Sequence, residues 1–238
     1  MERLTEFSRQ IEGLKAEGIV AWALATFGAA NIALASSLGR EDQVLTHMLK
    51  SRSGEARIFT LDSGRLFQET FEAMETTSER YDFKYELYFP ESRDVESLIR
   101  ESGPNLFYRS VEDRRRCCEI RKVRPLKKAL SGLTAWICGL RREQSPTRAD
   151  VLSLEWDGQF GLYKINPLFD WSQADLIEYM DQNDVPVHRL QRHGFTSIGC
   201  APCTRAIENG EDIRAGRWWW ESPEHKECGL HGGEKRAN

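Results

Sequence analysis

The chain has 238 residues, of which 40% are hydrophobic and 29% are charged. This composition is that of a water-soluble globular protein large enough to bury a core, and it excludes collagen-like, mucin-like and wholly disordered chains. The formal charge of −4 provides no general electrostatic attraction to nucleic acid, so any anion site has to be local.

Residues 19–39 carry no charge and are long enough for a membrane span. The stretch is rich in Ala and is interrupted by Gly28 and Asn31, so we interpret it as a helix, a turn and a buried strand, and we expect no membrane association. Glu2 and Glu6 stand where a secretory signal needs positive charge, so we expect a cytoplasmic protein. In that compartment, six cysteines favour metal binding or catalysis over disulfides.

Short apolar runs alternate with helically spaced segments over most of the chain. We expect strands at residues 32–35, 57–61, 84–88 and 135–137, and helices at 42–50, 68–81, 95–101 and 120–130. A further helix is expected from Ser172, which would cap it together with Asp175. Strands that alternate with helices predict an α/β fold with a mostly parallel sheet and flanking helices.

The composition changes after residue 184. Residues 185–238 are rich in Gly, Pro, His, Cys and Trp and show only short helical patterns. We therefore expect an α/β nucleotide-binding body over residues 1–184 and an irregular C-terminal segment over 185–238 that wraps it within the same domain.

Two strand-to-helix junctions have the composition of anion-binding loops. The first reads Ser36-Ser-Leu-Gly-Arg-Glu-Asp42, where small residues would expose backbone N–H groups at a helix N-terminus. It lacks the Gly-Lys-Ser/Thr ending of a Walker loop. The second reads Leu61-Asp-Ser-Gly-Arg65, where the Asp would bond a ribose or a base edge and the Arg a phosphate. Ordinary tight turns use the same residues, so a turn that binds no ligand remains the alternative at both junctions.

Two close cysteine pairs supply four thiols. Cys117 and Cys118 are adjacent, and Cys200 and Cys203 follow after a long interval. Four thiolates are the ligand set of zinc or of an iron-sulfur cluster. Adjacent ligands are awkward around one small ion, so the pattern favours a 4Fe-4S cluster over zinc, with chance placement of reduced thiols as the alternative. Residues 109–128 carry nine basic side chains against three acidic ones, which would compensate an anionic cluster or substrate.

The remaining cysteine signal is Cys228, which lies near Lys226 and His231. Neighbouring cations favour the nucleophilic thiolate, whereas an inert tail cysteine is the alternative. Arginine forks suit phosphate and sulfate oxygens, and four of them stand on expected loops: Arg141, Arg142, Arg214 and Arg217.

Together and in this order, the motifs resemble the assimilatory sulfonucleotide reductases, and specifically the cluster-containing adenylyl-sulfate (APS) reductases. The motifs are Cys117-Cys118, Ile120-Arg-Lys-Val-Arg-Pro125, Cys200-x-x-Cys203, Gly216-Arg-Trp-Trp-Trp220 and Glu227-Cys-Gly-Leu-His231. The resemblance runs from Ser36 to His231. It implies an adenine nucleotide α-hydrolase-like fold related to the ATP pyrophosphatases.

The resemblance also implies the reaction, in which APS and reduced thioredoxin or glutaredoxin give sulfite and AMP during sulfate assimilation. Cys228 would carry an S-sulfonate intermediate, and Lys122 would stand between the phosphosulfate and a 4Fe-4S cluster. The cluster ligands would be Cys117, Cys118, Cys200 and Cys203. The expected substrate-binding residues are Ser36, Ser37, Gly39, Glu41, Asp42, Leu61, Asp62, Gly64, Arg65, Arg141, Arg142, Arg214, Arg217 and His231. Leu38 departs from the family pattern, because many relatives have another Ser there.

Three other functions are considered. A reductase for the 3′-phosphorylated substrate PAPS, or for both nucleotides, would use the same chemistry, but its usual forms lack the four cluster cysteines. An ATP-dependent adenylating enzyme would need a full Ser-Gly-Gly-x-Asp-Ser loop, which is missing. The non-enzyme alternative is a metal-stapled nucleotide-binding redox sensor with Cys228 as its switch. A homo-oligomer is compatible with the sequence.

Overall fold

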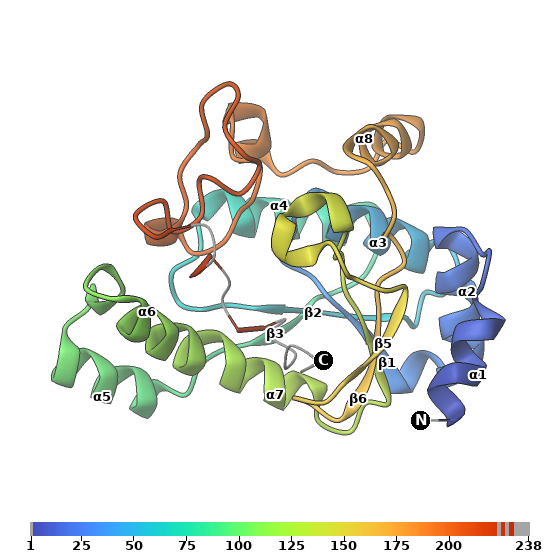
Figure 1. The fold of residues 1–238 in the computed structure, drawn as a ribbon, viewed down its shortest axis with the longest axis horizontal. Coiled ribbons are helices and arrows are strands. Elements are labelled where there is room, and N and C mark those ends of the chain that lie inside the picture. The colour runs from blue at the N-terminus through green and yellow to red at the C-terminus, as the bar shows by residue number, and fades with distance from the viewer. Residues whose placement is uncertain (1, 223–224, 227–228, 231–238) are drawn as a thin grey trace.

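The computed structural model describes residues 2–222, 225–226 and 229–230, which form a six-stranded sheet with helices on both faces (Figure 1). The strand order is β3-β2-β1-β4-β6-β5, and only β5 at the edge runs antiparallel to its neighbour within this described part of the chain. The predicted α/β fold with a mostly parallel sheet is therefore confirmed. The strands are β1 (Ile32–Ala35), β2 (Arg57–Leu61), β3 (Glu86–Tyr88), β4 (Ala135–Ile137), β5 (Leu154–Asp157) and β6 (Leu162–Ile165).

Helices cover the sheet in two layers. Those described are α1 (Glu2–Gln10), α2 (Ala16–Phe27), α3 (Arg40–Lys50), α4 (Gln68–Tyr81), α5 (Ser92–Ser102), α6 (Val111–Cys118), α7 (Arg124–Leu130) and α8 (Gln173–Gln182). In Figure 1, α3 and α4 lie on one side of the sheet, and α5, α6 and α7 lie on the other. A π-helical turn, η3 (Glu119–Val123), joins α6 to α7, and two 3-10 turns, η6 (Arg189–His193) and η7 (Ala201–Cys203), lie in the C-terminal segment.

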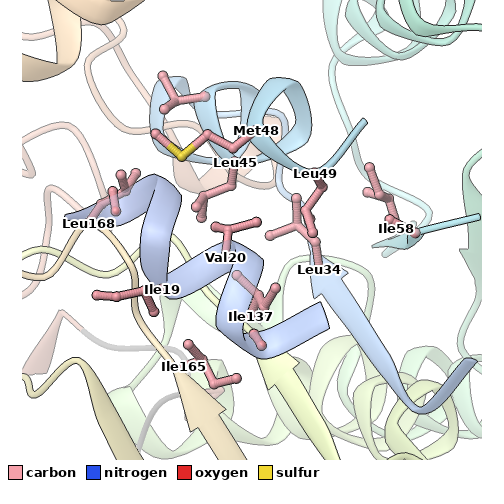
Figure 2. Close-up of a cluster of buried hydrophobic side chains, with 14 of the residues drawn as sticks. Ile19, Val20, Leu34, Leu45, Met48, Leu49, Ile58, Ile137, Ile165 and Leu168 are labelled. Carbon is pink, nitrogen blue, oxygen red and sulfur yellow. The ribbon is translucent and has the colours of Figure 1, made fainter. Parts of the chain in front are cut away.

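Alternation along the strands divides the core into two clusters. Leu34 of β1 packs with Val20, Leu45 and other side chains of α2 and α3, as Figure 2 shows. Ala33, the preceding residue, faces the opposite cluster, which contains Leu126 of α7. Because successive strand residues point to opposite faces, an apolar strand needs helices on both sides, and the fold supplies them.

The sequence prediction misses helix α1 and strands β5 and β6, and it misses two features next to the expected cysteine motif. Helix α6 was not expected because five of its eight residues are charged; it is capped by Ser110 Oγ, which accepts from Asp113 N at 3.0 Å. The helix expected at 120–130 is split, because its first turn belongs to η3. Hydrophobic periodicity does not report these features, since capping and π-turns depend on local hydrogen bonds.

The uncharged stretch at 19–39 becomes the body of α2, a 3-10 turn and strand β1. Over the described residues, no helix has both the length and the apolar character that a membrane crossing requires.

Candidate functional site

A cavity of about 480 Å³ lies at the carboxyl ends of β1, β2 and β4; we call it the sheet-end cavity. The strand order reverses at β1. The chain continues from β1 to β2 on one side of it, and β4 pairs with β1 on the other side. The crevice beside such a central strand is where open α/β sheets bind ligands. The loop after β1 lines the cavity through Ser36, Ser37 and Gly39, and the loop after β4 through Gly139.

The β1 loop is held by the carboxylate of Asp42. Its Oδ2 accepts hydrogen bonds from the backbone N of Ser37 at 2.6 Å and from Ser37 Oγ at 2.7 Å. Burial raises the pKa of Asp42 to about 6, although the bonds from Ser37 oppose the shift. Leu38 is fully buried in the core with a positive φ of 60°, so this departure from the family pattern has a packing role.

The loop after β4 approaches the β1 loop so closely that only glycine fits. A Cβ on Gly139 would stand 2.6 Å from Asp42 Oδ1 and 2.7 Å from Glu41 Cβ. Beside it, the buried Arg141 donates to Glu41 Oε1 at 2.9 Å, Trp171 O at 3.0 Å and Gln173 Oε1 at 2.8 Å. Arg141 therefore fixes Glu41 at the cavity wall.

Cationic side chains dominate the charged lining of the sheet-end cavity. They are Arg40, Lys122, Arg141, Arg148, Arg214 and Arg217, against the acids Glu41 and Asp42. Arg217 is buried, and its Nε has no hydrogen-bond partner among the described residues. A buried donor without a partner costs free energy, and a hydrogen bond from Nε to an anionic ligand would remove that cost.

The four cysteines of the two pairs meet in a second, smaller space of about 20 Å³; we call it the cysteine cavity. Cys117 and Cys118 come from the end of α6, and Cys200 and Cys203 flank the start and end of η7. All four are buried in one cluster with Trp218. Ser63 Oγ lies 3.1 Å from Cys200 Sγ, so the loop after β2 also reaches this cavity.

The thiols differ in their electrostatic environment. Burial raises the pKa of Cys203 to about 12 and also raises that of Cys117. Burial acts in the same direction on Cys200, but Lys122, Ser63 and Arg217 together hold its pKa below the ordinary value. The cations on α6, η3 and Arg217 therefore favour negative charge at one end of the cysteine cavity.

The four thiols of the cysteine cavity are the donor set to be compared with the expected cluster. Within the described residues, no group of three or more His, Cys, Asp or Glu side chains is placed to hold one metal ion. The thiols nevertheless share one cavity with cations, and the buried Trp218 Nε1 there lacks a hydrogen-bond partner among the described groups. Four cysteine thiolates are the ligand set of a 4Fe-4S cluster, so the residues present fit that group.

The described residues of the tail are 221–222, 225–226 and 229–230, and they reach back to the sheet-end cavity. Leu230 lines the sheet-end cavity and packs on the cluster that contains Trp136 and Leu126. Arg214 Nη2 donates to Lys226 O at 2.9 Å. Cys228 and His231, the expected nucleophile and an expected substrate ligand, lie outside the described residues.

A family model for the phosphoadenosine phosphosulfate reductase domain matches residues 31–206, which include both cavities' cysteine and loop motifs. The chain belongs to this family. The resemblance seen in the sequence is thereby confirmed.

Two relatives of this reductase-domain chain are named adenosine 5′-phosphosulfate reductase. That of Allochromatium vinosum is 50% identical over 84% of this chain and 78% of its own length. That of Sinorhizobium fredii is 47% identical over 96% of this chain and 90% of its own. Among solved structures, a phosphoadenylyl-sulfate reductase from Candida auris has a TM-score of 0.72 at 23% identity and covers 87% of this chain and 97% of its own. A Candida glabrata FMN adenylyltransferase has a TM-score of 0.55 at 17% identity, covering 90% and 72%. These two structures support the expected nucleotide-hydrolase-like fold.

The reductase-domain fold brings most of the expected site residues together, but not all. The sheet-end cavity is lined by Ser36, Ser37, Gly39, Glu41, Asp42, Leu61, Lys122, Arg141, Arg214 and Arg217. Asp62 instead accepts from Gly64 N at 2.7 Å in a turn of the β2 loop. Arg65 lines the cysteine cavity and donates to Pro104 O at 2.5 Å. Arg142 donates to Val151 O and stacks on Phe169, so it lines neither cavity.

Several cavity residues were missed by the sequence analysis. Arg40 and Arg148 line the sheet-end cavity beside the arginines that were expected there. Thr70, Ser197 and Gly199 also line it. Arg40 follows Gly39 in the first loop, so its position alone was a usable signal. No sequence signal marked Gly199, because its role is to leave space for the side chain of Arg217. A Cβ at this position would overlap the Arg217 guanidinium.

Proposed function

We propose that this protein reduces adenylyl sulfate to sulfite and AMP in sulfate assimilation, with reduced thioredoxin or glutaredoxin as the thiol donor. The names of the relatives support this substrate, since they share about half of their residues with this chain over most of its length. The cation-rich cavity at the carboxyl edge of the sheet suits a nucleotide that carries a phosphosulfate.

One observation carries the proposal: Lys122 and Arg217 line both cavities. With its adenosine over the loops after β1 and β2, a nucleotide would direct its phosphosulfate toward these two cations. The anion would then lie between the sheet-end cavity and the four thiols. That placement suits cleavage of the sulfur–oxygen bond, because charge on the departing AMP is stabilised by cations that are already in position.

The chemistry assigned to the chain's own residues is a thiol transfer. The Cys228 thiolate attacks the sulfur of APS, the sulfur–oxygen bond to the phosphate breaks, and AMP leaves with the electron pair. Cys228 then carries an S-sulfonate. A thiol of reduced thioredoxin attacks Cys228 Sγ, sulfite leaves with the sulfur–sulfur electron pair, and the second thioredoxin thiol resolves the mixed disulfide. The two electrons come from the thioredoxin dithiol.

A 4Fe-4S cluster is part of the proposal, held by Cys117, Cys118, Cys200 and Cys203. When bound, it supplies an anionic, polarisable group beside Lys122, and no electron transfer to the substrate is assigned to it. The cationic lining and the unpartnered indole N–H of Trp218 support this cofactor. The cysteines are distributed over α6 and η7, so a bound cluster would also join those elements.

Steady-state sulfite release with APS or PAPS, thioredoxin and thioredoxin reductase tests the proposal. We expect turnover with APS and little with PAPS. In Lys122→Ala, kcat should fall about 100-fold or more, because the charge acts on the departing anion, while the Kd for AMP changes little. Lys122→Arg, which keeps the charge, is the matched control. Turnover with PAPS alone would overturn the choice of substrate, and no turnover with either would overturn the activity.

A further inference from the structure

Arg114 is a fully buried arginine that joins α6 to the tail. Its side chain forms a bidentate ion pair with Glu221, with Nε to Oε1 at 3.0 Å and Nη2 to Oε2 at 2.7 Å. The Glu221 side chain is also buried, at 3% exposure. Nη2 donates further to the backbone oxygen of His225 at 2.6 Å. One guanidinium therefore holds two points of the tail that leads to Cys228.

The same side chain faces the cysteine cavity. Arg114 lies four residues before Cys118 on α6, and both side chains line the cysteine cavity. Its guanidinium lies over the ring of Trp218, 4.8 Å from the centroid, and Arg217 lies over that ring at 4.5 Å. Arg114 thus lines the cysteine cavity, contacts Trp218 and holds the tail.

Stability alone gives a weak reason for this arrangement. Removing two charges from water is costly, and a well-packed apolar pair is often as stable as a buried ion pair. An apolar pair does not fix the relative orientation of its two partners. A planar guanidinium does, because it donates to a carboxylate and a backbone oxygen in one fixed geometry. Arg114 and Arg214 donate to the successive carbonyls of residues 225 and 226, so the fixed part is the tail backbone just before Cys228.

Figure 1 shows the loop that ends in the tail lying beside α6, although the two are about a hundred residues apart in the sequence. We propose that Arg114 is a positioning residue, which fixes the tail against the cysteine-bearing helix so that Cys228 is delivered to the sheet-end cavity. The functional part of this inference rests on the proposed role of Cys228. The structural part, that Arg114 controls the order of the tail, can be tested without substrate.

Glu221→Gln is the informative variant, since it keeps the shape of the side chain and removes the charge. Arg114→Lys keeps the charge but loses the fork. Glu86→Gln is the matched control. Arg57 and Glu86 form another bidentate pair, at the first residues of β2 and β3 and outside both cavities. Should the single variants fold poorly, Arg114→Met with Glu221→Leu replaces the pair by apolar side chains and still removes the donor to residue 225.

Two measurements decide the matter. Hydrogen exchange would be followed at the amides of Glu221 and His225, whose backbone bonds run to Trp218 O and Ser222 O. Single-turnover sulfonation by APS, without reductant, would be followed alongside the Kd for AMP. In Glu221→Gln and Arg114→Lys we expect tail exchange to be at least tenfold faster and sulfonation at least tenfold slower. The Kd for AMP should stay within twofold, and Glu86→Gln should match the wild type.

Unchanged tail exchange in both variants would overturn the inference. So would faster exchange throughout α6 and the sheet with an unchanged rate of sulfonation per folded molecule, because that is the signature of a purely stabilising pair. If wild-type protein takes no sulfonate from APS, the proposed function fails, but the exchange measurement still decides whether Arg114 positions the tail.

Discussion

At the scale of single residues, the sheet-end cavity depends on close approach between two loops. Gly139 allows the loop after β4 to touch Asp42 and Glu41, and Asp42 in turn holds the amide of Ser37. The loop composition predicted an anion site, and the structure places Ser36, Ser37 and Gly39 on the wall of the sheet-end cavity. The need for Gly139 could not be predicted, because it follows from a contact about a hundred residues away in the sequence.

Gly139→Ala should disturb the β1 loop. The added Cβ would stand 2.6 Å from Asp42 Oδ1, closer than any van der Waals contact, so one of the two loops has to move. We expect the Kd for AMP, measured by calorimetry, to rise at least tenfold. Gly158→Ala is the control, because a Cβ there meets no atom within 4 Å. Equal affinities in the two variants would refute the role given to this contact.

Asp42 should make stability depend on pH. Its pKa is raised from 3.8 to about 6, so between about pH 4 and pH 6 the native state keeps a proton that the unfolded chain has lost. The free energy of unfolding therefore falls as the pH rises through this window, by up to about 3 kcal/mol from this group.

Asp42→Asn removes that contribution and can still accept the bonds from Ser37. Relative to the wild type, the variant should gain stability as the pH rises from about 4 to 6, measured by urea unfolding at several pH values. A constant difference between the two proteins over that range would contradict the raised pKa.

At the scale of elements, periodicity predicted the strands β1, β2 and β4 and helix α4 at their observed bounds. It failed between residues 111 and 123, where the chain bears two of the four cavity cysteines and Lys122. The buried residues of α6 are Arg114 and two cysteines in place of aliphatic residues, so this helix has no apolar stripe to be recognised. The π-turn that follows is a feature often found at functional sites.

The tail is an element whose attachment can be tested separately. Leu230 packs on the cluster that contains Trp136 and lines the sheet-end cavity. In Leu230→Asp, a charge would have to enter that apolar contact, so the tail should leave the cavity. We expect sulfite release to fall at least tenfold, with the Kd for AMP little changed. Leu152→Asp, at an exposed leucine, is the control and should retain activity.

At the scale of the whole molecule, the fold joins distant parts of the sequence around the two cavities. The family resemblance anticipated that the two cysteine pairs would meet, and the structure buries all four thiols in one cluster. Spacing alone could not establish this, because 81 residues, which include strands β4, β5 and β6, separate Cys118 from Cys200. The roles of the arginines could not be predicted from the sequence either. Arg141 forms internal hydrogen bonds that hold the cavity wall, and Arg142 lies outside the cavities.

Metal analysis tests the cluster proposal. Anaerobically purified protein should contain iron and acid-labile sulfide in equal amounts. Cys203→Ser should lose both together with most of the activity, because an open coordination site destabilises the metal centre. Cys138 is a buried cysteine that directly follows β4 and lies in a different hydrophobic cluster. The variant Cys138→Ser should therefore keep its iron. Zinc in place of iron would refute the cluster.

The central claim is that Cys228 accepts a sulfonate from APS, and the intact mass of the protein tests it most directly. Cluster-containing protein would be incubated anaerobically with APS or, separately, with PAPS, and with no thiol reductant. The account predicts the gain of one sulfonate with APS, its loss on addition of reduced thioredoxin, and no adduct in Cys228→Ser. No adduct with either nucleotide, in protein shown to contain its cluster, would contradict it.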